Sequence, residues 1–222
     1  RSESGVAIDN TNFPDANFRT VVENFDTNKD SSLSDTEIAA VEAIDCSRKG
    51  ITNLKGIEYF TSLNILRCTD NQLTALDVSE NTALTKLNCC FNKLTSLDVS
   101  KNTALISLSC VCNQLTSLDV SKNTALQILN CNYNQLTVLD VSKNTALTGL
   151  KCRNNQLTVL DVSKNTALTD LECRDNQLTV LDVSKNTALT DLECRNNQLT
   201  SLDVSNTNMD DLYCGGNIYQ II

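Results

Sequence analysis

Several residue types on which enzymes rely are scarce or missing in this chain of 222 residues. It contains no His and no Trp, one Pro and six Gly. The absence of His removes the side chain that most often acts as a general base or as a metal ligand near neutral pH. A mechanism based on carboxylates alone stays open, but the composition favours a protein that is not an enzyme.

The charge balance also narrows the range of partners. Asp and Glu number 27 against 18 Lys and Arg, which gives a net charge of −9. Nucleic acids and anionic membrane surfaces are bound mainly through basic residues, so both are disfavoured. No apolar run approaches the roughly 20 residues that span a bilayer, and we predict no transmembrane segment. The chain begins at Arg1 with no signal-like stretch, and we interpret it as a secreted or cell-surface protein whose signal peptide has been removed.

Eleven cysteines could indicate a disulfide framework, but their spacing indicates a repeat. From Cys68 to Cys194 a cysteine recurs every 21 residues, and Cys214 follows after 20. A free cysteine behaves as a small apolar residue and is usually buried, so we predict a buried column of thiols. Cys90 and Cys112 interrupt the pattern. We place them at outward positions as the more reactive pair, with a disulfide between them as an alternative.

The repeat is clearest at 84–104, which reads Leu84-x-x-Leu87-x-Cys89-x-x-Asn92-x-Leu94-x-x-Leu97-Asp98-Val99-x-x-Asn102. Alternate residues of an extended segment face the same side, so each Leu-x-Cys predicts a short strand. Stacked units would pair these strands and bury the leucines together. Over about 44–217 the pattern resembles the leucine-rich-repeat family, with Cys in place of one aliphatic residue.

The predicted fold class is therefore a right-handed leucine-rich-repeat solenoid, mostly β, with few or no helices in the repeats. We expect about nine coils over 44–222, or about 40 Å of stack. The second half of each unit nearly repeats the first, which predicts a second short extended segment on the opposite wall. The asparagine after each strand, from Asn71 to Asn217, predicts an inward-facing ladder because an amide can both donate and accept. Ile218, Ile221 and Ile222 would cover the last coil or lead into a further domain.

Two charged columns accompany the Leu-Asp-Val half of the repeat. One runs from Asp77 to Asp203 and the other from Lys101 to Lys185. We interpret the aspartates as partners of turn backbone and the lysines as residues that keep this edge soluble. A stripe that binds calcium or a polyanion is the alternative.

Residues 1–43 lack the repeat and are predicted to form a small helical cap. A first helix is indicated after Pro14 by the helical spacing of Phe18, Val21, Val22 and Phe25. A second helix is indicated by Ile38, Val41 and Ile44, and Ser34 with Glu37 forms the pattern of a capping box at its start.

The segment between these helices resembles the calcium loop of EF-hand proteins. The resemblance implies Ca²⁺ held by Asp26, Asn28, Asp30, the carbonyl of Ser32, Ser34 through water, and a bidentate Glu37. Ser31 departs from the family, which has Gly at this position because a positive φ is required. The alternative is a degenerate loop that only caps the solenoid, its hydrogen bonds replacing the ion.

A helical, EF-hand-like cap fused directly to short leucine-rich repeats is similar to the internalin-type surface proteins of bacteria. The first coil, from Ile44 through Phe60 to Leu66, shares the 22-residue length of their units. The Cys-bearing, doubled unit of 21 residues departs from them and resembles the repeats of other bacterial surface proteins more. This likeness implies adhesion to a host.

Variation between repeats concentrates at the outward positions around each Leu-x-Cys strand. If the strands stack, these positions form one face with Phe91, Val111, Ile128 and Tyr133 at an apolar centre. Glu172 with Arg174 and Glu193 with Arg195 would form a charged C-terminal end. Aromatic residues beside Arg are typical of binding hot spots. The predicted ligand face comprises Arg67, Lys86, Asn88, Phe91, Val111, Ile128, Asn130, Tyr133, Lys151, Arg153, Asp170, Glu172, Arg174, Asp191, Glu193 and Arg195.

Three classes of function follow from this face. We favour a monomeric recognition or adhesion module that binds a protein or a glycan. The alternative is a rigid spacer within a larger surface protein, which the near-identical Leu-Asp-Val halves would also serve. An enzyme would need acids such as Asp170 and Asp191 clustered in a concave pocket, which a slim solenoid rarely forms.

Overall fold

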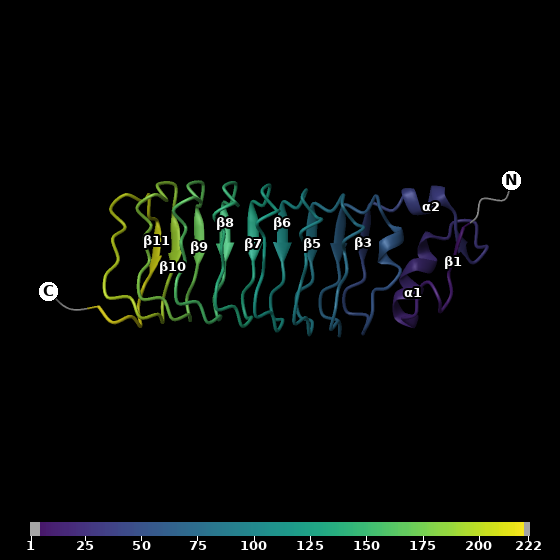
Figure 1. Ribbon diagram of the computed structural model, residues 1–222, viewed down its shortest axis with the longest axis horizontal. Helices are drawn as coiled ribbons and strands as arrows, with labels where there is room; N and C mark the ends of the chain where they lie inside the picture. Colours follow the sequence, from purple (N-terminus) through teal and green to yellow (C-terminus); the bar gives the residue numbers. More distant parts are fainter. Residues whose placement is uncertain (1–4, 220–222) are drawn as a thin grey trace.

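A computed structural model describes residues 5–219, which form an elongated stack of coils with a small cap at the N-terminal end (Figure 1). Each coil contributes one short strand to a parallel sheet of nine strands, ordered as in the chain. This confirms the predicted leucine-rich-repeat solenoid. The strands are β3 (Ala43–Asp45), β4 (Ile65–Arg67), β5 (Lys86–Asn88), β6 (Ser107–Ser109), β7 (Ile128–Asn130), β8 (Gly149–Lys151), β9 (Asp170–Glu172), β10 (Asp191–Glu193) and β11 (Asp211–Tyr213).

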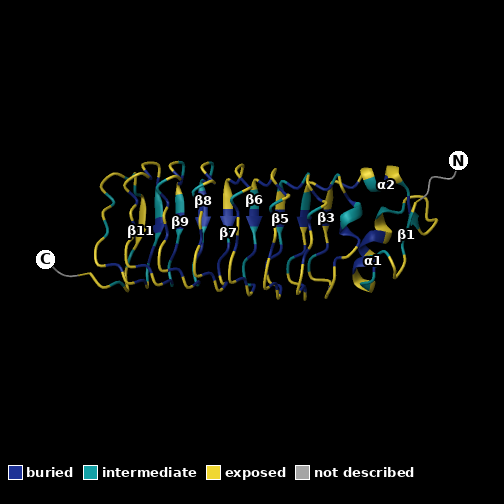
Figure 2. Ribbon diagram, in the orientation of Figure 1, coloured by how far each residue is buried: buried dark blue, intermediate teal, exposed yellow. Residues whose placement is uncertain are grey.

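Equivalent residues of neighbouring coils lie side by side in the sheet. Leu87 pairs with Leu66 on one side and with Leu108 on the other, and the side chains of all three are buried. Figure 2 shows the result as buried strips that run through the coils up to the last one, whose residues are exposed or intermediate. Within the described residues no helix is long and apolar enough to cross a membrane.

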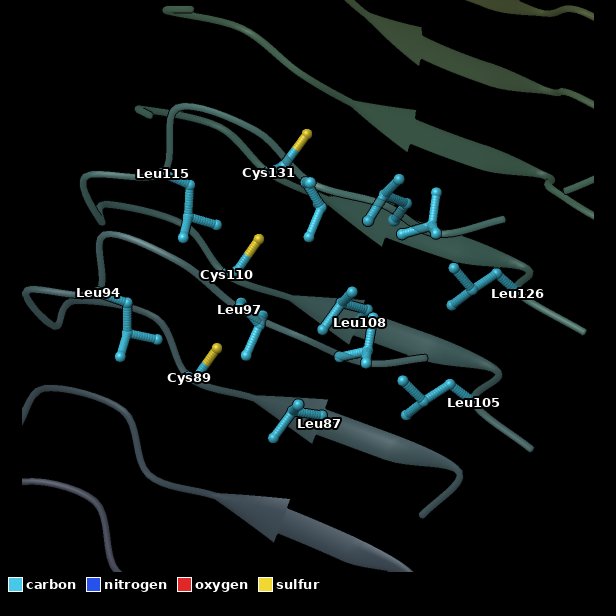
Figure 3. Packing of buried hydrophobic residues seen from close by; sticks show 14 of the residues in the cluster. Leu87, Cys89, Leu94, Leu97, Leu105, Leu108, Cys110, Leu115, Leu126 and Cys131 are labelled. Carbon is cyan, nitrogen blue, oxygen red and sulfur yellow. The ribbon is translucent and has the colours of Figure 1, made fainter. Parts of the chain in front are cut away.

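The predicted column of buried cysteines is confirmed. Cys89, Cys110 and Cys131 stack inside the coils beside the leucines (Figure 3), and none of the three is exposed. The Cys89 thiol donates to the carbonyl oxygen of Ser109 in the next coil at 3.6 Å. Burial raises the pKa of all three thiols well above its ordinary value, so they act as packing groups rather than as nucleophiles.

The asparagine that follows each strand faces inward, as predicted. The Asn113 amide donates to the carbonyl oxygens of Cys89 and Cys110, both at 3.1 Å, and its Oδ1 accepts from the N–H of Leu94 at 3.0 Å. A second buried ladder lies on the other wall, where the amide of Asn123 donates to the carbonyl oxygens of Val99 and Asn102 at 2.9 Å. Two columns of amides therefore join each coil to its neighbour.

The second extended segment predicted for the Leu-Asp-Val half does not form a strand. In the described residues this half of each unit contains neither a strand nor a helix. The reason lies in its backbone, which bonds within one coil: Asn102 N–H donates to the Val99 carbonyl at 3.0 Å, and Leu105 N–H to that of Asn102 at 3.1 Å. The Asp98 carboxylate accepts from the N–H of Ser100 at 2.9 Å, which confirms that the aspartates bond to turn backbone.

The cap contains two short helices and a two-stranded ribbon. Helix α1 (Ala16–Val22) is followed by a 3₁₀ helix, η1 (Glu23–Phe25), and β1 (Val6–Ala7) pairs antiparallel with β2 (Ser32–Leu33) ahead of α2 (Asp35–Ala39). The predicted capping box of Ser34 and Glu37 is confirmed at the start of α2. Pro14 precedes the N-cap residue of α1, Asp15, and so lies outside the first turn where we expected it.

The second helix is shorter than predicted. Ile44 belongs to β3, and Val41 follows the end of α2 as a buried residue. The carbonyl oxygen of Glu42 accepts from the N–H groups of Asn64 and Ile65, so pairing with the next coil replaces the continuation of the helix. Tertiary bonding thus overrides the helical spacing of these apolar residues.

One hydrophobic core runs from the cap into the coils. Phe13 packs against Phe18 with ring centroids 6.0 Å apart and against Phe60 of the first coil at 6.4 Å. The chain passes the Phe13 ring at Gly56, where φ is 105° and a Cβ atom would collide with the ring. Glycine is therefore required at this position, and η2 (Ile57–Tyr59) begins immediately after it.

The outward placement predicted for Cys90 is wrong. Its side chain is buried, with Sγ 2.9 Å from the Ser109 hydroxyl and accepting from the N–H of Val111 at 3.3 Å. Cys112 is half-buried, both thiols are free, and burial raises the pKa of each.

Candidate binding face

The residues predicted for the ligand face all lie on the outer side of the sheet or directly after its strands. Strands β4 to β10 turn their central leucine into the core and most of their first and third residues outward, as alternation requires. None of the predicted face residues is buried. The structure thus brings them together on one side, while their role in binding stays a prediction.

A column of left-handed backbone follows the sheet. One residue per coil has a φ between 53° and 69°; we call this set the left-handed column, and it comprises Arg48, Asp70, Phe91, Cys112, Tyr133, Asn154, Asp175, Asn196 and Gly216. Asn and Asp tolerate this conformation because their short polar side chains bond locally. Four coils have Asn or Asp here, whereas Phe91, Cys112 and Tyr133 occupy it in three consecutive coils. A bulky residue in this region costs on the order of 1 kcal/mol.

The apolar centre of the face contains one residue that the sequence comparison missed. Phe91 is 53% exposed, Ile128 41% and Tyr133 40%, and Val111 is partly exposed between them; we call these four residues the aromatic patch. Ile106, 37% exposed, adjoins them, since its carbonyl oxygen accepts from the N–H of Ile128 at 3.1 Å. Its position varies between repeats (Thr85, Ile106, Gln127, Thr148), and that variation was the available signal.

The C-terminal end of the face is charged, with pairings that differ in part from those predicted. The Glu193 carboxylate accepts from Arg195 at 2.7 and 2.6 Å, as predicted, and this pair lowers the pKa of Glu193. Glu172 pairs with Lys151 of the neighbouring strand at 2.7 Å instead of with Arg174. The hydrogen bond to Glu172 raises the pKa of Lys151.

A shallow hollow lies at this charged end. We call it the acidic hollow, and it is lined by Asp170, Glu172, Asp191, Leu192, Glu193, Asp211 and Tyr213. The guanidinium of Arg195 covers the ring of Tyr213 in this lining at 5.3 Å from its centroid, and that of Arg153 covers Tyr133 in the same way at 5.2 Å. Tyr213 is therefore a second face residue that the sequence comparison missed.

The loop from Asp26 to Glu37 has part of the conformation that an EF-hand requires. Ser31 has a φ of 66°, the left-handed value that Gly usually supplies, and its N–H donates to the Asp26 carboxylate at 2.9 Å. Asp30 N–H donates to the Asn28 amide oxygen at 2.9 Å. The backbone therefore fits the predicted loop.

Glu37 does not join these residues as a ligand would. Its carboxylate accepts from the N–H and hydroxyl of Thr27 at 2.7 and 2.6 Å and from the N–H of Ser34 at 3.0 Å. These bonds, that of the Thr27 hydroxyl first, lower the pKa of Glu37 to about 2. Across residues 5–219 no three Asp, Glu, Cys or His side chains are grouped so that they could hold a metal ion. Ca²⁺ would require Glu37 to exchange Thr27 for the ion.

No protein-family model matches the chain, but individual proteins do. Internalin J of Listeria monocytogenes serotype 4b (strain F2365) is 44% identical over 71 residues, which is 32% of this chain and 8% of that protein. The solved functional domain of InlJ from Listeria monocytogenes, which includes a cysteine ladder, is 36% identical with a TM-score of 0.58. That match covers 93% of this chain and 55% of the InlJ domain.

The chain is an internalin-like leucine-rich-repeat protein. Internalin C2 from Listeria monocytogenes str. 4b F2365 shares the fold at a TM-score of 0.86, with 23% identity over 96% of this chain and 99% of that one. We expected the Cys-bearing unit to separate the chain from internalins, and the cysteine ladder of InlJ shows that expectation to be wrong. This internalin-like chain spans less than a tenth of the length of the curated Internalin J proteins.

Proposed function

We propose that this chain is a non-catalytic recognition module, secreted or displayed on a bacterial surface, that binds a protein or a glycan through the strand face. The observation that carries the proposal is the left-handed column. Phe91 and Tyr133 occupy a backbone conformation that most other coils assign to Asn or Asp. Both rings are at least 40% exposed, so packing in the core does not account for them.

An exposed aromatic residue in a costly conformation is a sign of selection for contact. Asn at the same position would fold with less strain, as Asn154 and Asn196 do in later coils of this chain. Val111 and Ile128 extend the same apolar surface. Tyrosine beside arginine, as in the pair of Tyr133 and Arg153, is also the composition of interface hot spots.

A role in recognition rather than catalysis is supported by the kind of site that the face offers. The hollow at its charged end is shallow, whereas catalysis requires a concave site that excludes water. Three of the carboxylates in the hollow are already held in ion pairs, Asp170 and Glu172 by Lys151 and Glu193 by Arg195. The likeness to internalins points the same way.

The first experiment is a binding screen of the chain against extracellular proteins and glycans, run beside a double variant, Phe91→Asn with Tyr133→Asn. These substitutions introduce the residue native to the same position of other coils, so the fold is kept. A matched control changes Val138, Val159 and Val180 to Ser, the residue at the equivalent Ser96 and Ser117. These valines are 69% exposed on the Leu-Asp-Val half. A ligand lost by the face variant and kept by the control supports the proposal, and equal binding by both contradicts it.

The alternative is a rigid spacer. Three segments of the chain are identical in sequence, namely 135–148, 156–169 and 177–190. Identical coils suit a spacer, which needs a regular stack and no specific surface. A screen in which the parent chain binds nothing would favour the spacer over the recognition module.

We also propose calcium as a ligand of the loop from Asp26 to Glu37. The left-handed Ser31 and the turns at Asp26 and Asn28 support it. Asp26, Asn28, Asp30, the carbonyl of Ser32, Ser34 through water and Glu37 would hold the ion. Bound calcium would supply positive charge that fixes the loop against the first coil.

A further inference from the structure

The surroundings of the aromatic patch decide the sign of charge that a ligand must carry. Towards the C-terminus the outward strand positions become acidic in register. Asp170 pairs with Asp191 and Asp191 with Asp211, while Glu172 pairs with Glu193. Like charges directly opposite each other on neighbouring strands destabilise a sheet. These columns of carboxylates therefore destabilise the sheet on which they lie.

Only part of this negative charge is compensated within the molecule. Lys151 lies 3.3 Å from Asp170 and 2.7 Å from Glu172, and Arg195 lies 2.6 Å from Glu193. Within residues 5–219, Asp191 and Asp211 form no ion pair. The five carboxylates of the acidic hollow thus face two paired cations, in a chain whose net charge is already −9.

The patch and the hollow are one continuous surface. Arg153 of the coil after Tyr133 covers the tyrosine ring, and Lys151 of the same coil contacts the first carboxylates of the hollow. Ile128 of the aromatic patch is in register with Asp191 three coils further along the sheet, which at about 4.8 Å per coil is about 14 Å. An extended peptide covers that distance in about four residues.

From this charge complementarity, and resting on the proposed function, we propose that the ligand is a protein. It places an apolar side chain on the aromatic patch and a Lys or Arg side chain, about four extended residues away, beside Asp191 and Asp211. The basic side chain relieves the repulsion between stacked carboxylates, and the ring of Tyr213 borders the same hollow. An acidic glycan would be repelled by these carboxylates, and a neutral one would not respond to them.

The test uses two synthetic peptides that differ in one feature. Both carry Leu and Tyr at one end; four residues further one carries two Arg and the other two Glu. Binding is measured by fluorescence polarisation at low and at physiological salt. The arginine peptide should bind more tightly than the glutamate peptide and weaken as salt is added.

The decisive variant is Asp191→Asn with Asp211→Asn, compared with Asp140→Asn and Asp161→Asn on the Leu-Asp-Val half, which removes the same charge. The first pair should weaken the arginine peptide about five- to tenfold, and the second should leave it unchanged. Equal loss in both pairs, or no preference for arginine, overturns the proposal. Asp191→Asn should also raise the Tm, and a lower Tm would show that the carboxylate has a stabilising partner.

The two proposals fail in different ways. Suppose that a ligand from the screen no longer binds the Phe91→Asn, Tyr133→Asn variant, but that neither Asp191→Asn with Asp211→Asn nor added salt changes its affinity. That result supports the recognition module and overturns the proposal that the ligand is a protein with a basic side chain. A ligand that binds the Phe91→Asn, Tyr133→Asn variant as tightly as it binds the parent chain overturns the proposed function itself.

Discussion

The guanidinium of Arg153 lies over the ring of Tyr133, 5.2 Å from its centroid, and joins the aromatic part of the face to its charged part. In the described residues, no such pair covers Phe91. Both aromatic residues have the same left-handed backbone, so they share its strain and differ in what holds the ring.

This difference predicts different changes in the free energy of unfolding for two similar substitutions. Phe91→Asn should raise the free energy of unfolding by up to about 1 kcal/mol, because Asn relieves the strain. Tyr133→Asn gains the same relief but loses a cation–π contact of about 0.5–1 kcal/mol, so its stability should stay close to that of the parent. Urea denaturation of the three proteins measures both. A Phe91→Asn protein less stable than the parent would show that the ring is held by packing.

The asparagine ladder predicts a large cost for a single buried amide. Asn113→Ala removes the bonds that the amide donates to the carbonyl oxygens of Cys89, Cys110 and Val111, and it leaves the N–H of Leu94 unpaired in the core. We expect a loss of about 2–4 kcal/mol. The neighbouring Gln114 is exposed, and Gln114→Ala should change stability by less than about 0.5 kcal/mol. Equal effects in denaturant unfolding would contradict a structural role for the ladder.

The hydrogen bonds of Glu37 predict that the stability of the cap depends on pH in the acidic range. Because its pKa is lowered from 4.5 to about 2 in the folded protein, its bonds to Thr27 and Ser34 stabilise the fold fully above about pH 4.5. That contribution should decrease as the pH falls and be lost near pH 2. The stability difference between the parent and Glu37→Gln should therefore shrink over this interval. A difference independent of pH would contradict the assignment.

Calcium predicts a thermal shift that depends on the loop. Added Ca²⁺ should raise the Tm of the parent, because an ion that binds only the folded state stabilises it. Asp26→Ala with Asp30→Ala should abolish the rise, and Mg²⁺ serves as the control ion. A parent chain indifferent to calcium would assign the loop to hydrogen bonding alone, with Glu37 kept on Thr27.

The parts of the fold that could be predicted from the sequence are those fixed by periodicity. One Leu-x-Cys per 21 residues determines the strands, the buried thiols and the asparagine column, and the capping box of Ser34 and Glu37 determines the start of α2. Where a local pattern competed with a bond between coils, the prediction failed. Ile44 has helical spacing but belongs to β3, which pairs with β4 of the next coil. In the Leu-Asp-Val half, turn bonds within the coil, such as that of Asn102 to Val99, take the place of a second strand.

The candidate face could be located from variation between repeats, but its details could not. Which carboxylate Lys151 would contact depends on the register of β8 and β9 and on side-chain reach. The burial of Cys90 depends on the small Ser109 beside it. The left-handed backbone at Phe91 and Tyr133 has no sequence signal in those coils, and only the Asn and Asp of other coils hint at it. Ile221 and Ile222, which we expected near the last coil, lie outside the described residues.

The units 156–176 and 177–197 differ only at Asp175 and Asn196, two residues suited to the same turn. Removing or duplicating one such unit would leave every remaining amide opposite the same kind of carbonyl oxygen and every leucine against a leucine. The length of this protein can therefore evolve in steps of one coil, by recombination between near-identical stretches of its gene. Each step would shorten or lengthen the acidic hollow by one coil of about 4.8 Å, with its Asp and Glu, and leave the aromatic patch unchanged.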